Sequence, residues 1–353
     1  TMNEARRVAA YLEALNYPPG SRIAIMSKNC AHWLMTDFAS WMAGHVSVPL
    51  YPTLTARSVR QILEHSGAKA VFAGKLDSWD EMRRGIPDGV LQISYPLSPP
   101  NDLPGWDRIV ATTAALEGQP LRDADELATI VYTSGTTGVP KGVMHRFATL
   151  GWCPDDIVAQ TGACAEDRVL SYLPLAHVAE REVMEMLAVR TGMHVYFCES
   201  LDTFLQDLQR ARPTLFFSVP RLWVKFQQGV STKMPERRLK RLLEIPIVGT
   251  VIRRKILRQL GLDHVRVAGS GAAPISAATM NWYRDLGLEL LEGYGMTELF
   301  GLSHMCRPGT VRVGYVGQAM NDVDCKLSED GEVLIRSPGN TLGYYLDPDR
   351  TRE

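Results

Sequence analysis

The sequence lacks several features that mark whole classes of protein. No apolar run approaches the ~20 residues that a membrane-spanning helix needs. The six cysteines form no Cys-x-x-Cys pair, which excludes the usual zinc-site spacings. The first residues have no apolar segment of the signal-peptide kind. Repeats and low-complexity segments are absent too. Together these absences predict a protein with reduced thiols and a cytoplasmic location.

A strong charge of either sign is also lacking. The chain carries 38 Lys and Arg against 39 Asp and Glu, which gives a formal net charge of -1. Without a net positive field, nucleic acid is not expected as a partner. The composition is that of an ordinary globular protein, with 45% hydrophobic residues, so the 353 residues can form two or three units with their own cores.

Short apolar runs alternate with helical patterns along most of the chain. This alternation predicts an α/β fold with two doubly wound, mostly parallel sheets at about 1–147 and 148–308. After about Gly309, short runs between turn residues predict a small antiparallel, barrel-like part at 309–353. Strands are predicted at Arg22–Met26, Val46–Pro49, Ala70–Ala73, Thr129–Thr133, Val169–Leu173, His194–Phe197, Leu215–Val219 and Val265–Ala268. Helices are predicted at Ala31–Met42, Arg57–His65, Glu180–Val189, Phe204–Ala211 and Ala277–Leu286.

The segment TSGTTGVPKG, Thr133–Gly142, directly follows the predicted strand TIVYT. Its glycines let the backbone turn tightly and approach a ligand, and its N–H groups can cradle phosphate oxygens. A Walker A loop is excluded, because Pro140 stands where glycine is required and Gly142 where Ser or Thr is required. A flexible hairpin is the alternative, but a linker rarely needs a strand before it and a lysine at its end. The side chains suited to phosphate are Ser134, Thr136, Thr137 and Lys141.

Two more glycine-rich segments follow predicted strands, GSGAAP at Gly269–Pro274 and EGYGMTE at Glu292–Glu298. Neither has the third glycine of a dinucleotide-binding fingerprint. In the second segment, glycines flank Tyr294 and leave its ring face open to stack on a base, although such a tyrosine is more often a packing residue. Thr297 and Glu298 add a hydroxyl and a carboxylate suited to a phosphate and its Mg²⁺. Three such loops predict a ligand site at the carboxyl edge of parallel strands.

Five motifs occur in the order found in the acyl-adenylate-forming (AMP-binding) superfamily, which the chain resembles. They are TSGTTGVPKG, YLPLAHVAER, GSGAAP, EGYGMTE and GEVLIRSPGNTLGYY. That superfamily holds acyl-CoA synthetases, luciferases and peptide-synthetase adenylation domains. YLPLAHVAER and SVPRLW are most similar to the long-chain fatty acyl-CoA synthetase branch. The resemblance covers nearly all of 1–353 and implies its large N-terminal adenylation domain.

The resemblance also implies roles for single residues. The loop would hold the β- and γ-phosphates of ATP, Tyr294 would stack on adenine, and Thr297 would contact the α-phosphate and the substrate carboxylate. His177 would lie near that carboxylate, or alternatively be a structural histidine. The implied nucleotide-binding residues are Thr133, Ser134, Gly135, Thr136, Thr137, Gly138, Lys141, Gly271, Ala272, Ala273, Glu292, Gly293, Tyr294, Gly295 and Thr297. The implied catalytic residues are Lys141, His177, Thr297 and Glu298, with Glu298 as the Mg²⁺ ligand.

The implied activity is ATP-dependent activation of a fatty acid to acyl-AMP, followed by thioester formation with coenzyme A. Transfer to a carrier protein and a non-catalytic nucleotide-binding module are the alternatives. The family continues past GYY with a ribose-binding aspartate and a small C-terminal domain that carries a catalytic lysine. Because the sequence stops at Glu353, we expect a fragment with weak or no turnover. The sequence leaves acyl chain length and oligomeric state open.

A last stretch, Lys233–Arg258, is strongly basic and also rich in aliphatic residues. A solvated helical hairpin is one interpretation. The other is a surface that contacts anionic lipid, where each cation contributes ~1 kcal/mol, which would add a peripheral membrane contact to the cytoplasmic location. Its basic residues are Lys233, Arg237, Arg238, Lys240, Arg241, Arg253, Arg254, Lys255 and Arg258, against Glu236 and Glu244.

Overall fold

The computed structural model describes residues 1–133 and 140–352, which fall into two compact units. The first unit comprises Thr1–Gly151, Leu173–Arg181 and Gly339–Glu353. The second comprises Trp152–Tyr172 and Glu182–Pro338. The chain therefore leaves the first unit and returns to it twice.

The first unit is built on a seven-stranded sheet with the order β16-β6-β5-β2-β1-β3-β4. Strands β1 to β5 run parallel to one another, and β6 and β16 are antiparallel additions at one edge. The strands are β1 Arg22–Met26, β2 Val46–Leu50, β3 Ala70–Ala73, β4 Leu91–Ser94, β5 Leu127–Thr133, β6 Lys141–Arg146 and β16 Gly343–Tyr344. The helices are α1 Met2–Ala14, α2 Ala31–Met42, α3 Ala56–Ser66, α4 Trp79–Arg83, α5 Trp106–Thr112, α7 Val178–Glu180 and α14 Pro348–Arg352.

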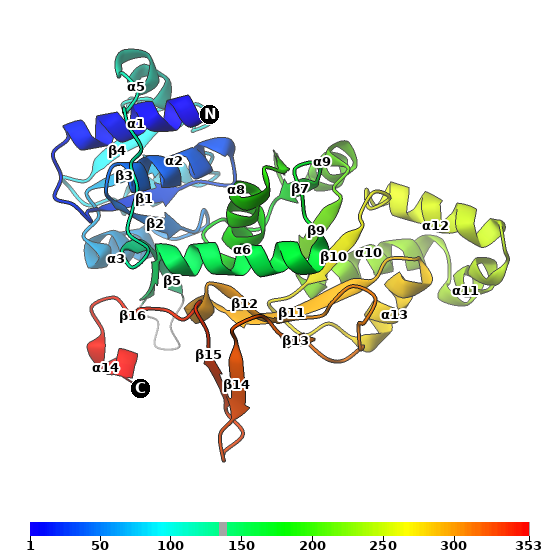
Figure 1. Cartoon of the computed structure of the whole chain (residues 1–353). Helices are drawn as coiled ribbons and strands as arrows, with labels where there is room; N and C mark the ends of the chain where they lie inside the picture. The colour runs from blue at the N-terminus through cyan, green and yellow to red at the C-terminus, as the bar shows by residue number, and fades with distance from the viewer. Residues whose placement is uncertain (134–139, 353) are drawn as a thin grey trace. The chain divides into compact units, whose positions relative to one another are not determined.

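Both faces of this sheet are covered, as the alternation along β1 demonstrates. Ile23 and Ile25 belong to one buried cluster, with residues of α1, α2 and α5. Ala24 and Met26 belong to another, with residues of α3 and α4. Because successive strand side chains point to opposite faces, two clusters on one strand mean two covered faces. Figure 1 shows α1 and α2 lying along the same part of this unit, in dark blue.

The second unit contains a five-stranded sheet with the order β13-β12-β11-β10-β9. Strands β9, β10 and β11 are parallel, and β12 and β13 are antiparallel. The strands are β7 Arg168–Ser171, β8 His194–Phe197, β9 Leu215–Ser218, β10 Val267–Ser270, β11 Leu290–Met296, β12 Gly301–Met305, β13 Gln318–Ala319, β14 Asp324–Leu327 and β15 Val333–Arg336. The helices are α8 Leu187–Thr191, α9 Phe204–Ala211, α10 Pro220–Lys233, α11 Glu236–Glu244, α12 Val248–Gln259 and α13 Ala277–Asp285, with a 3-10 turn η2 at Thr297–Leu299.

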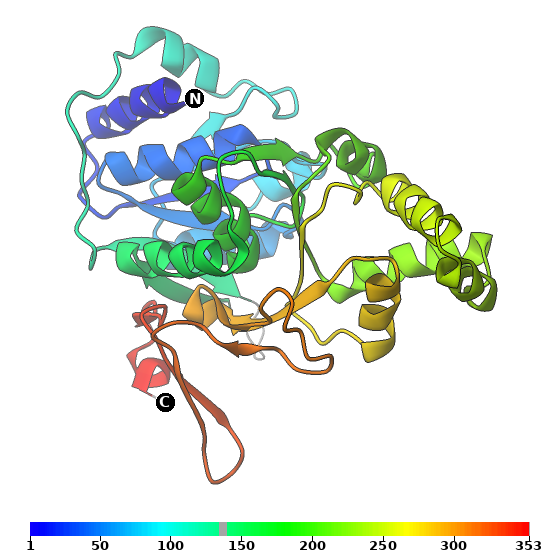
Figure 2. The same cartoon turned by 45° about the vertical axis from the view of Figure 1, so that its right-hand side comes forward.

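Two helical segments run across the boundary between the units along the chain. Helix α6 covers Phe147–Thr161, and η1, a π-helix, covers Arg181–Met186. In the second unit, one core cluster joins α9 to α13 with one face of the sheet, and a smaller one joins α6, η1 and α8 with the other face. Figure 2 shows α10, α11 and α12 in succession, from green to yellow.

The predicted α/β class is confirmed. The eight predicted strands correspond to β1, β2, β3, β5, β7, β8, β9 and β10, and their ends differ by no more than two residues. The residues after Gly309 pair antiparallel as predicted, in β12–β13, β14–β15 and β16–β6. The predicted helical hairpin in Lys233–Arg258 is also present, as α11 and α12.

Two local predictions were wrong. EGYGMTE was predicted as a loop after a strand, yet β11 continues through it to Met296. The reason is β12, which pairs with Gly293–Met296 and keeps the glycines extended. The helix predicted at Glu180–Val189 is instead divided into α7, the π-helix η1 and α8.

Candidate functional site

The described ends of the TSGTTGVPKG segment lie on two paired strands of the first unit. Thr133 is the last residue of β5, Lys141 is the first of β6, and their Cα atoms are direct antiparallel partners. A Cβ on Gly142 would approach the Ile130 side chain to 2.7 Å, so this position excludes larger residues. The predicted ligands Ser134, Gly135, Thr136, Thr137 and Gly138 lie outside the described residues.

His177 begins the short helix α7 of the first unit. Its Nδ1 accepts a hydrogen bond of 3.2 Å from the Ala179 N–H, so it caps the helix. Burial lowers the pKa of His177, which keeps the ring neutral at pH 7. Asn29 fixes the preceding segment, because its side chain donates to the Leu173 carbonyl at 2.6 Å and accepts from the Leu175 N–H at 3.1 Å. The structural contact predicted as the alternative is present, and a role near a carboxylate stays a prediction.

The GSGAAP segment of the second unit forms an exposed loop after β10. Ala272 has a φ of +64°, a left-handed backbone that is uncommon for a residue with a side chain. Ala272, Ala273 and Pro274 are exposed, whereas Gly271 is buried. A Cβ on Gly271 would come within 3.2 Å of the Gly293 carbonyl oxygen, so the two glycine-rich segments pack closely here.

Glu292 anchors this loop from the neighbouring strand. Its side chain is buried, and its Oε1 accepts a hydrogen bond of 3.2 Å from the Ile275 N–H, just after the loop. Its Cα is the direct partner of Ser270 on β10. Glu292 was predicted to bind nucleotide, and the contact observed here is one that holds the loop in place.

The remaining predicted residues lie at the end of β11 and in the turn η2 that follows it. Tyr294 pairs with His304 across the two strands, and their rings meet edge to face with centroids 6.0 Å apart. Burial lowers the pKa of His304. Gly295 has no room for a side chain, because a Cβ would lie 1.6 Å from the Gly301 carbonyl oxygen. Thr297, Glu298 and Leu299 form the turn η2, where the first two are half-buried.

A buried glutamate behind this turn escaped the sequence analysis. Glu182 of η1 accepts a hydrogen bond of 3.2 Å from the Leu302 N–H through its Oε2. A Cβ on Gly301 would lie 1.8 Å from the same oxygen, so that glycine is needed. Burial raises the pKa of Glu182 to about 8. No signal in the sequence distinguishes Glu182 from its acidic neighbours, because only tertiary contact brings it to β12.

An apolar cavity of about 60 Å³ lies in the second unit, between the sheet and the helical segments α6, η1 and α8. That volume is several times the ~10–15 Å³ that one water molecule requires. Residues of three parallel strands line it, most of them at alternate positions that share one face of the sheet. Ser270 and Gly293, which belong to the two glycine-rich segments, are among its walls. The lining residues on β9, β10 and β11 include Leu215, Phe217, Val267, Gly269, Leu291 and Gly293.

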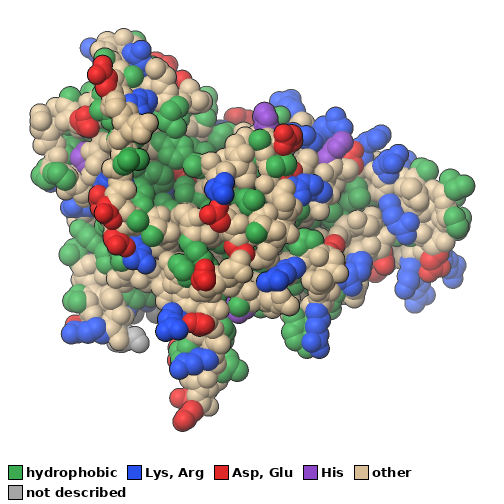
Figure 3. Space-filling view, in the orientation of Figure 1, with side chains coloured by type: hydrophobic (Ala, Val, Ile, Leu, Met, Phe, Trp, Pro, Cys, Tyr) green, Lys and Arg blue, Asp and Glu red, His purple; other side chains and the backbone are tan. Residues whose placement is uncertain are grey.

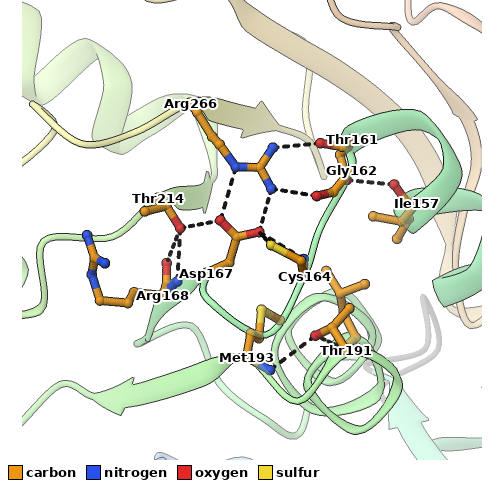
Figure 4. Close-up of polar contacts among 11 residues, drawn as sticks. Ile157, Thr161, Gly162, Cys164, Asp167, Arg168, Thr191, Met193, Thr214 and Arg266 are labelled. Carbon is orange, nitrogen blue, oxygen red and sulfur yellow. Dashed lines mark hydrogen bonds and ion pairs between the residues drawn. The ribbon is translucent and has the colours of Figure 1, made fainter.

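A charged network lies at the opposite ends of β9 and β10, where Thr214 and Arg266 meet Asp167, the residue before β7 (Figure 4). Arg266 donates from its Nε to Asp167 at 3.0 Å, and a second ion pair joins the same two side chains. The two Nη atoms of Arg266 donate to the carbonyls of Thr161 and Gly162 at 2.6 and 3.0 Å. The Thr214 hydroxyl donates to Asp167 at 2.6 Å. Burial acts to raise the pKa of Asp167, but hydrogen bonds from Arg266 and Thr214 hold it below its usual value.

Among the described residues, no cluster of three or more His, Cys, Asp and Glu side chains could hold a metal ion by itself. Mg²⁺ is usually held by one or two carboxylates together with phosphates and water. A single half-buried carboxylate at Glu298 fits that donor set. No helix among the described residues is long and apolar enough to cross a bilayer.

Comparison with known proteins gives consistent matches. A family model described as AMP-binding enzyme matches residues 1–345. The long-chain-fatty-acid–CoA ligase FadD15 of Mycobacterium bovis is 30% identical, over 99% of this chain and 64% of the relative. The peroxisomal long chain acyl-CoA synthetase 6 of Arabidopsis thaliana is 32% identical, over 95% of this chain and 54% of the relative. The chain thus spans 54% and 64% of the lengths of these two relatives.

Solved structures share the fold. An anthranilate CoA ligase, AuaEII, in complex with anthranoyl-AMP has a TM-score of 0.81 at 20% identity, over 99% of this chain and 66% of that one. The N-terminal domain of FACL13 from Mycobacterium tuberculosis has a TM-score of 0.77 at 23% identity, over 99% and 84% of the two chains. At these identities the likeness concerns the fold alone. The family model nevertheless spans nearly every residue and agrees with the motif order, so the chain belongs to the AMP-binding enzyme family, the acyl-adenylate-forming superfamily that its motifs resemble.

Proposed function

We propose that the chain is the ATP-binding part of a fatty acid–CoA ligase. The observation that carries this proposal is the apolar cavity of the second unit, which has Ser270 and Gly293 of the two glycine-rich segments in its wall. A carboxylic acid with an alkyl tail is the substrate class that suits an apolar cavity ending near polar loops. The names of the relatives, long-chain fatty acid–CoA ligases at 30% and 32% identity, support the same substrate class.

The proposed chemistry needs no nucleophile from the protein. A carboxylate oxygen bonds to the α-phosphorus of ATP while the bond to pyrophosphate breaks, and acyl-AMP forms. The coenzyme A thiol then gives up its proton and attacks the acyl carbon, and AMP leaves. Because anion meets anion in the first step, the site must hold developing negative charge. We assign Thr133–Lys141 to the β- and γ-phosphates, and Gly271–Ala273 with Tyr294 to adenine.

Thr297 and Glu298 are proposed to act at the reacting phosphate. The Thr297 hydroxyl would donate to an α-phosphate oxygen, and Glu298 would hold Mg²⁺. When bound, Mg²⁺ supplies positive charge that stabilises the charge on phosphate oxygens. Their position on the short turn η2, between two paired strands, would keep both side chains oriented. His177, neutral because burial lowers its pKa, is proposed to lie near the carboxylate as a hydrogen-bonding group.

Acid-dependent exchange between ATP and pyrophosphate tests this function. A series of saturated fatty acids should support exchange, and each buried methylene should strengthen binding by ~0.8 kcal/mol until the cavity is full. Preference for acetate or benzoate would overturn the substrate class. If thioester formation requires a carrier protein, the acceptor is that protein and not coenzyme A. No exchange with any acid, despite nucleotide binding, would favour a non-catalytic module.

The cavity can be tested separately with Gly269→Leu. A Cβ at Gly269 already approaches the Phe217 ring to 3.0 Å, so leucine should fill the cavity and weaken fatty-acid binding while ATP binding persists. Gly229→Leu is the matched control, because Gly229 lies on α10 with nothing within 4 Å of a Cβ. Equal effects of the two substitutions on fatty-acid affinity would remove the cavity from the proposal.

Two further features belong to this proposal. The chain spans 64% and 54% of the lengths of the two curated relatives, and we propose that 1–353 alone binds nucleotide and turns over slowly. Rates of pyrophosphate release by this chain and by a protein of the relatives' full length should differ by at least ~10²-fold, the usual cost of one lost charged contact. We also propose that Lys233–Arg258 contacts a membrane surface, the source of an apolar substrate.

A further inference from the structure

The hairpin of α11 and α12 ends in exposed aliphatic side chains, which is unusual for a surface loop. Ile247 is 81% exposed and Val251 is 60% exposed, and Ile245 and Val248 are exposed beside them. A contiguous apolar patch on a folded surface marks a contact with a protein, a ligand or a membrane. Figure 3 shows hydrophobic atoms at the end of this hairpin, with Lys and Arg side chains nearby.

The rest of the hairpin is anchored, so the exposed tip is not the end of a loose segment. Leu239 and Leu243 of α11 and Ile256 of α12 are buried in the main core cluster of the second unit. Arg253 donates to the Leu243 carbonyl at 3.0 Å and to the Asp285 carbonyl at 2.8 Å. Each helix therefore turns one face to the core and leaves its tip residues to solvent.

The basic residues follow the apolar tip at short distances on both helices. Arg254 and Arg258 come three and seven residues after Val251, about 4.5 and 10.5 Å along the helix axis. Arg241 precedes Ile245 by four residues, about 6 Å. An interfacial apolar face enters a bilayer by ~5–10 Å, to the boundary of headgroups and acyl chains. These cations would then lie at the depth of the phosphates.

Positive charge on the hairpin is largely uncompensated within the protein. Glu236 and Glu244 are its acidic residues. In the part of the chain that the structure describes, six basic side chains of the hairpin make neither an ion pair nor a hydrogen bond, and Arg258 pairs with Asp263 at 3.5 Å. The six are Arg237, Arg238, Lys240, Arg241, Arg254 and Lys255.

A polar hollow beside α12 adds to this surface. Arg254 and Arg258 line it together with Arg212 and His264, and Asp263 contributes a carboxylate. Three guanidinium groups against one carboxylate favour an anion, and guanidinium is well suited to phosphate oxygens. The hollow lies on the same helix as the apolar tip, so one anionic surface can contact both.

We propose that the α11–α12 tip inserts into an anionic lipid bilayer, with Ile245, Ile247, Val248 and Val251 among the acyl chains and the flanking arginines on lipid phosphates. The inference specifies the membrane contact of the proposed function. It does not depend on ligase activity, because binding to vesicles needs neither ATP nor substrate. Insertion would place the enzyme where its proposed apolar substrate dissolves.

Sedimentation with vesicles tests the insertion. The chain should bind vesicles of equal parts phosphatidylcholine and phosphatidylglycerol, and bind phosphatidylcholine alone far more weakly. Binding should fall between ~0.1 M and ~1 M salt, as the screening length shortens from ~10 to ~3 Å. No binding to the anionic vesicles, or equal binding to both kinds, overturns the proposal.

Matched variants distinguish vesicle binding through the tip from non-specific adsorption. Ile247→Ser with Val251→Ser should weaken vesicle binding at least tenfold, because two aliphatic side chains lose their burial. Leu121→Ser is the control, since Leu121 is 85% exposed in the first unit, and it should change nothing. Arg254→Gln and Arg258→Gln should each cost about fivefold. Equal losses from the tip and control variants would refute the assignment.

Two additional outcomes identify other occupants. Titration of the chain with phosphate ions alone shows whether the hollow binds free anion without vesicles. Vesicle binding through the tip should remain measurable at saturating phosphate. If phosphate abolishes vesicle binding, the surface is assigned to a soluble anion instead. A concentration-dependent dimer that disappears in the Ile247→Ser, Val251→Ser variant would assign the patch to a second copy of the chain. Circular dichroism should show the same fold for all variants.

Discussion

The two ends of the parallel strands β9, β10 and β11 use polar residues in opposite ways. At the N-terminal ends of β9 and β10, Thr214 and Arg266 bond to Asp167, the residue before β7, and to backbone carbonyls. At their C-terminal ends, Ala272 and Ala273 are exposed on a loop, and the turn η2 presents its polar residues half-buried. Both ends belong to one sheet in one unit, with the apolar cavity between its strands and α6.

The difference shows which polar residues of this sheet stabilise and which are available to a ligand. A buried charge that is fully paired has no bonding capacity left for a substrate, and its removal is costly. Residues at the carboxyl ends of parallel strands are held by short turns, and ligands bind at such edges in open α/β sheets. We therefore expect substitutions at the N-terminal ends to change stability and those at the C-terminal ends to change activity.

The largest effect is expected from Arg266→Ala. Its loss leaves the buried Asp167 without its cation. The cost should lie toward the lower end of the ~3–5 kcal/mol of unfolding free energy typical of a buried pair, because Arg266 is 39% exposed and water screens it. Denaturant unfolding measures this change directly. Arg336→Ala is the control, because Arg336 pairs with Asp324 on the exposed hairpin β14–β15 and should lose little. A loss no greater than that of the control would mean that the network is not structural.

Glu298→Gln should lower activity and leave stability almost unchanged. We expect ATP–pyrophosphate exchange in the active enzyme to fall by ~10²–10³, about 2.7–4 kcal/mol of barrier, while stability stays within ~0.5 kcal/mol. The charge at the proposed metal ligand is lost and its shape is kept. Glu329→Gln, an exposed residue beside β14, provides the control. Unchanged exchange would show that the metal assignment is wrong.

Glu292→Ala should affect both properties, because Glu292 lies at the C-terminal edge yet holds the loop. The buried Ile275 N–H loses its acceptor, which typically costs ~1–3 kcal/mol. Nucleotide affinity should fall as well, since the loop Gly271–Pro274 loses an anchor. Glu292→Gln keeps an acceptor oxygen and should retain most of both. The unfolding free energy and the ATP affinity, the latter by calorimetric titration, are compared for the two variants. If Glu292→Ala and Glu292→Gln change both equally, the lost hydrogen bond to the Ile275 N–H is not the cause.

The smallest effect concerns pH. Burial lowers the pKa of His304, so the unfolded chain takes up the proton first as pH falls below ~6.5. The stability that neutral His304 contributes is fully present above that pH, and it is lost as the pH falls through the lowered pKa of His304 in the folded state. Asp167 differs, because the pKa of its carboxyl is already below ~3.9 and its contribution persists to lower pH.

Stability measured from pH 7.5 to 5 in wild type and His304→Gln isolates the contribution of His304 to the pH dependence. The wild type should lose stability toward pH 5 relative to the variant, because buried histidines elsewhere cancel in the difference. Arg266→Ala should not change that difference. A wild type and a variant with parallel pH profiles would contradict the assigned shift.

The sequence by itself determined the fold class and the family. The glycine-rich motifs occur in the family's order, and close approach of neighbouring atoms leaves no room for a side chain at glycines such as Gly295 and Gly142. Apolar runs also identified β1, β3 and β8 to the residue. Roles for Thr297, Glu298 and Tyr294 came from the same motifs and stay proposals.

Only the tertiary structure decided what surrounds those motifs. Asp167 and Arg266 lie 99 positions apart, and their pairing depends on which strands become neighbours. Glu182 reaches the Leu302 N–H across 120 positions, and Gly269 joins the cavity because the register places it on the same sheet face as Phe217. Contacts of this kind depend on strand order, register and helix packing, which local sequence patterns do not encode.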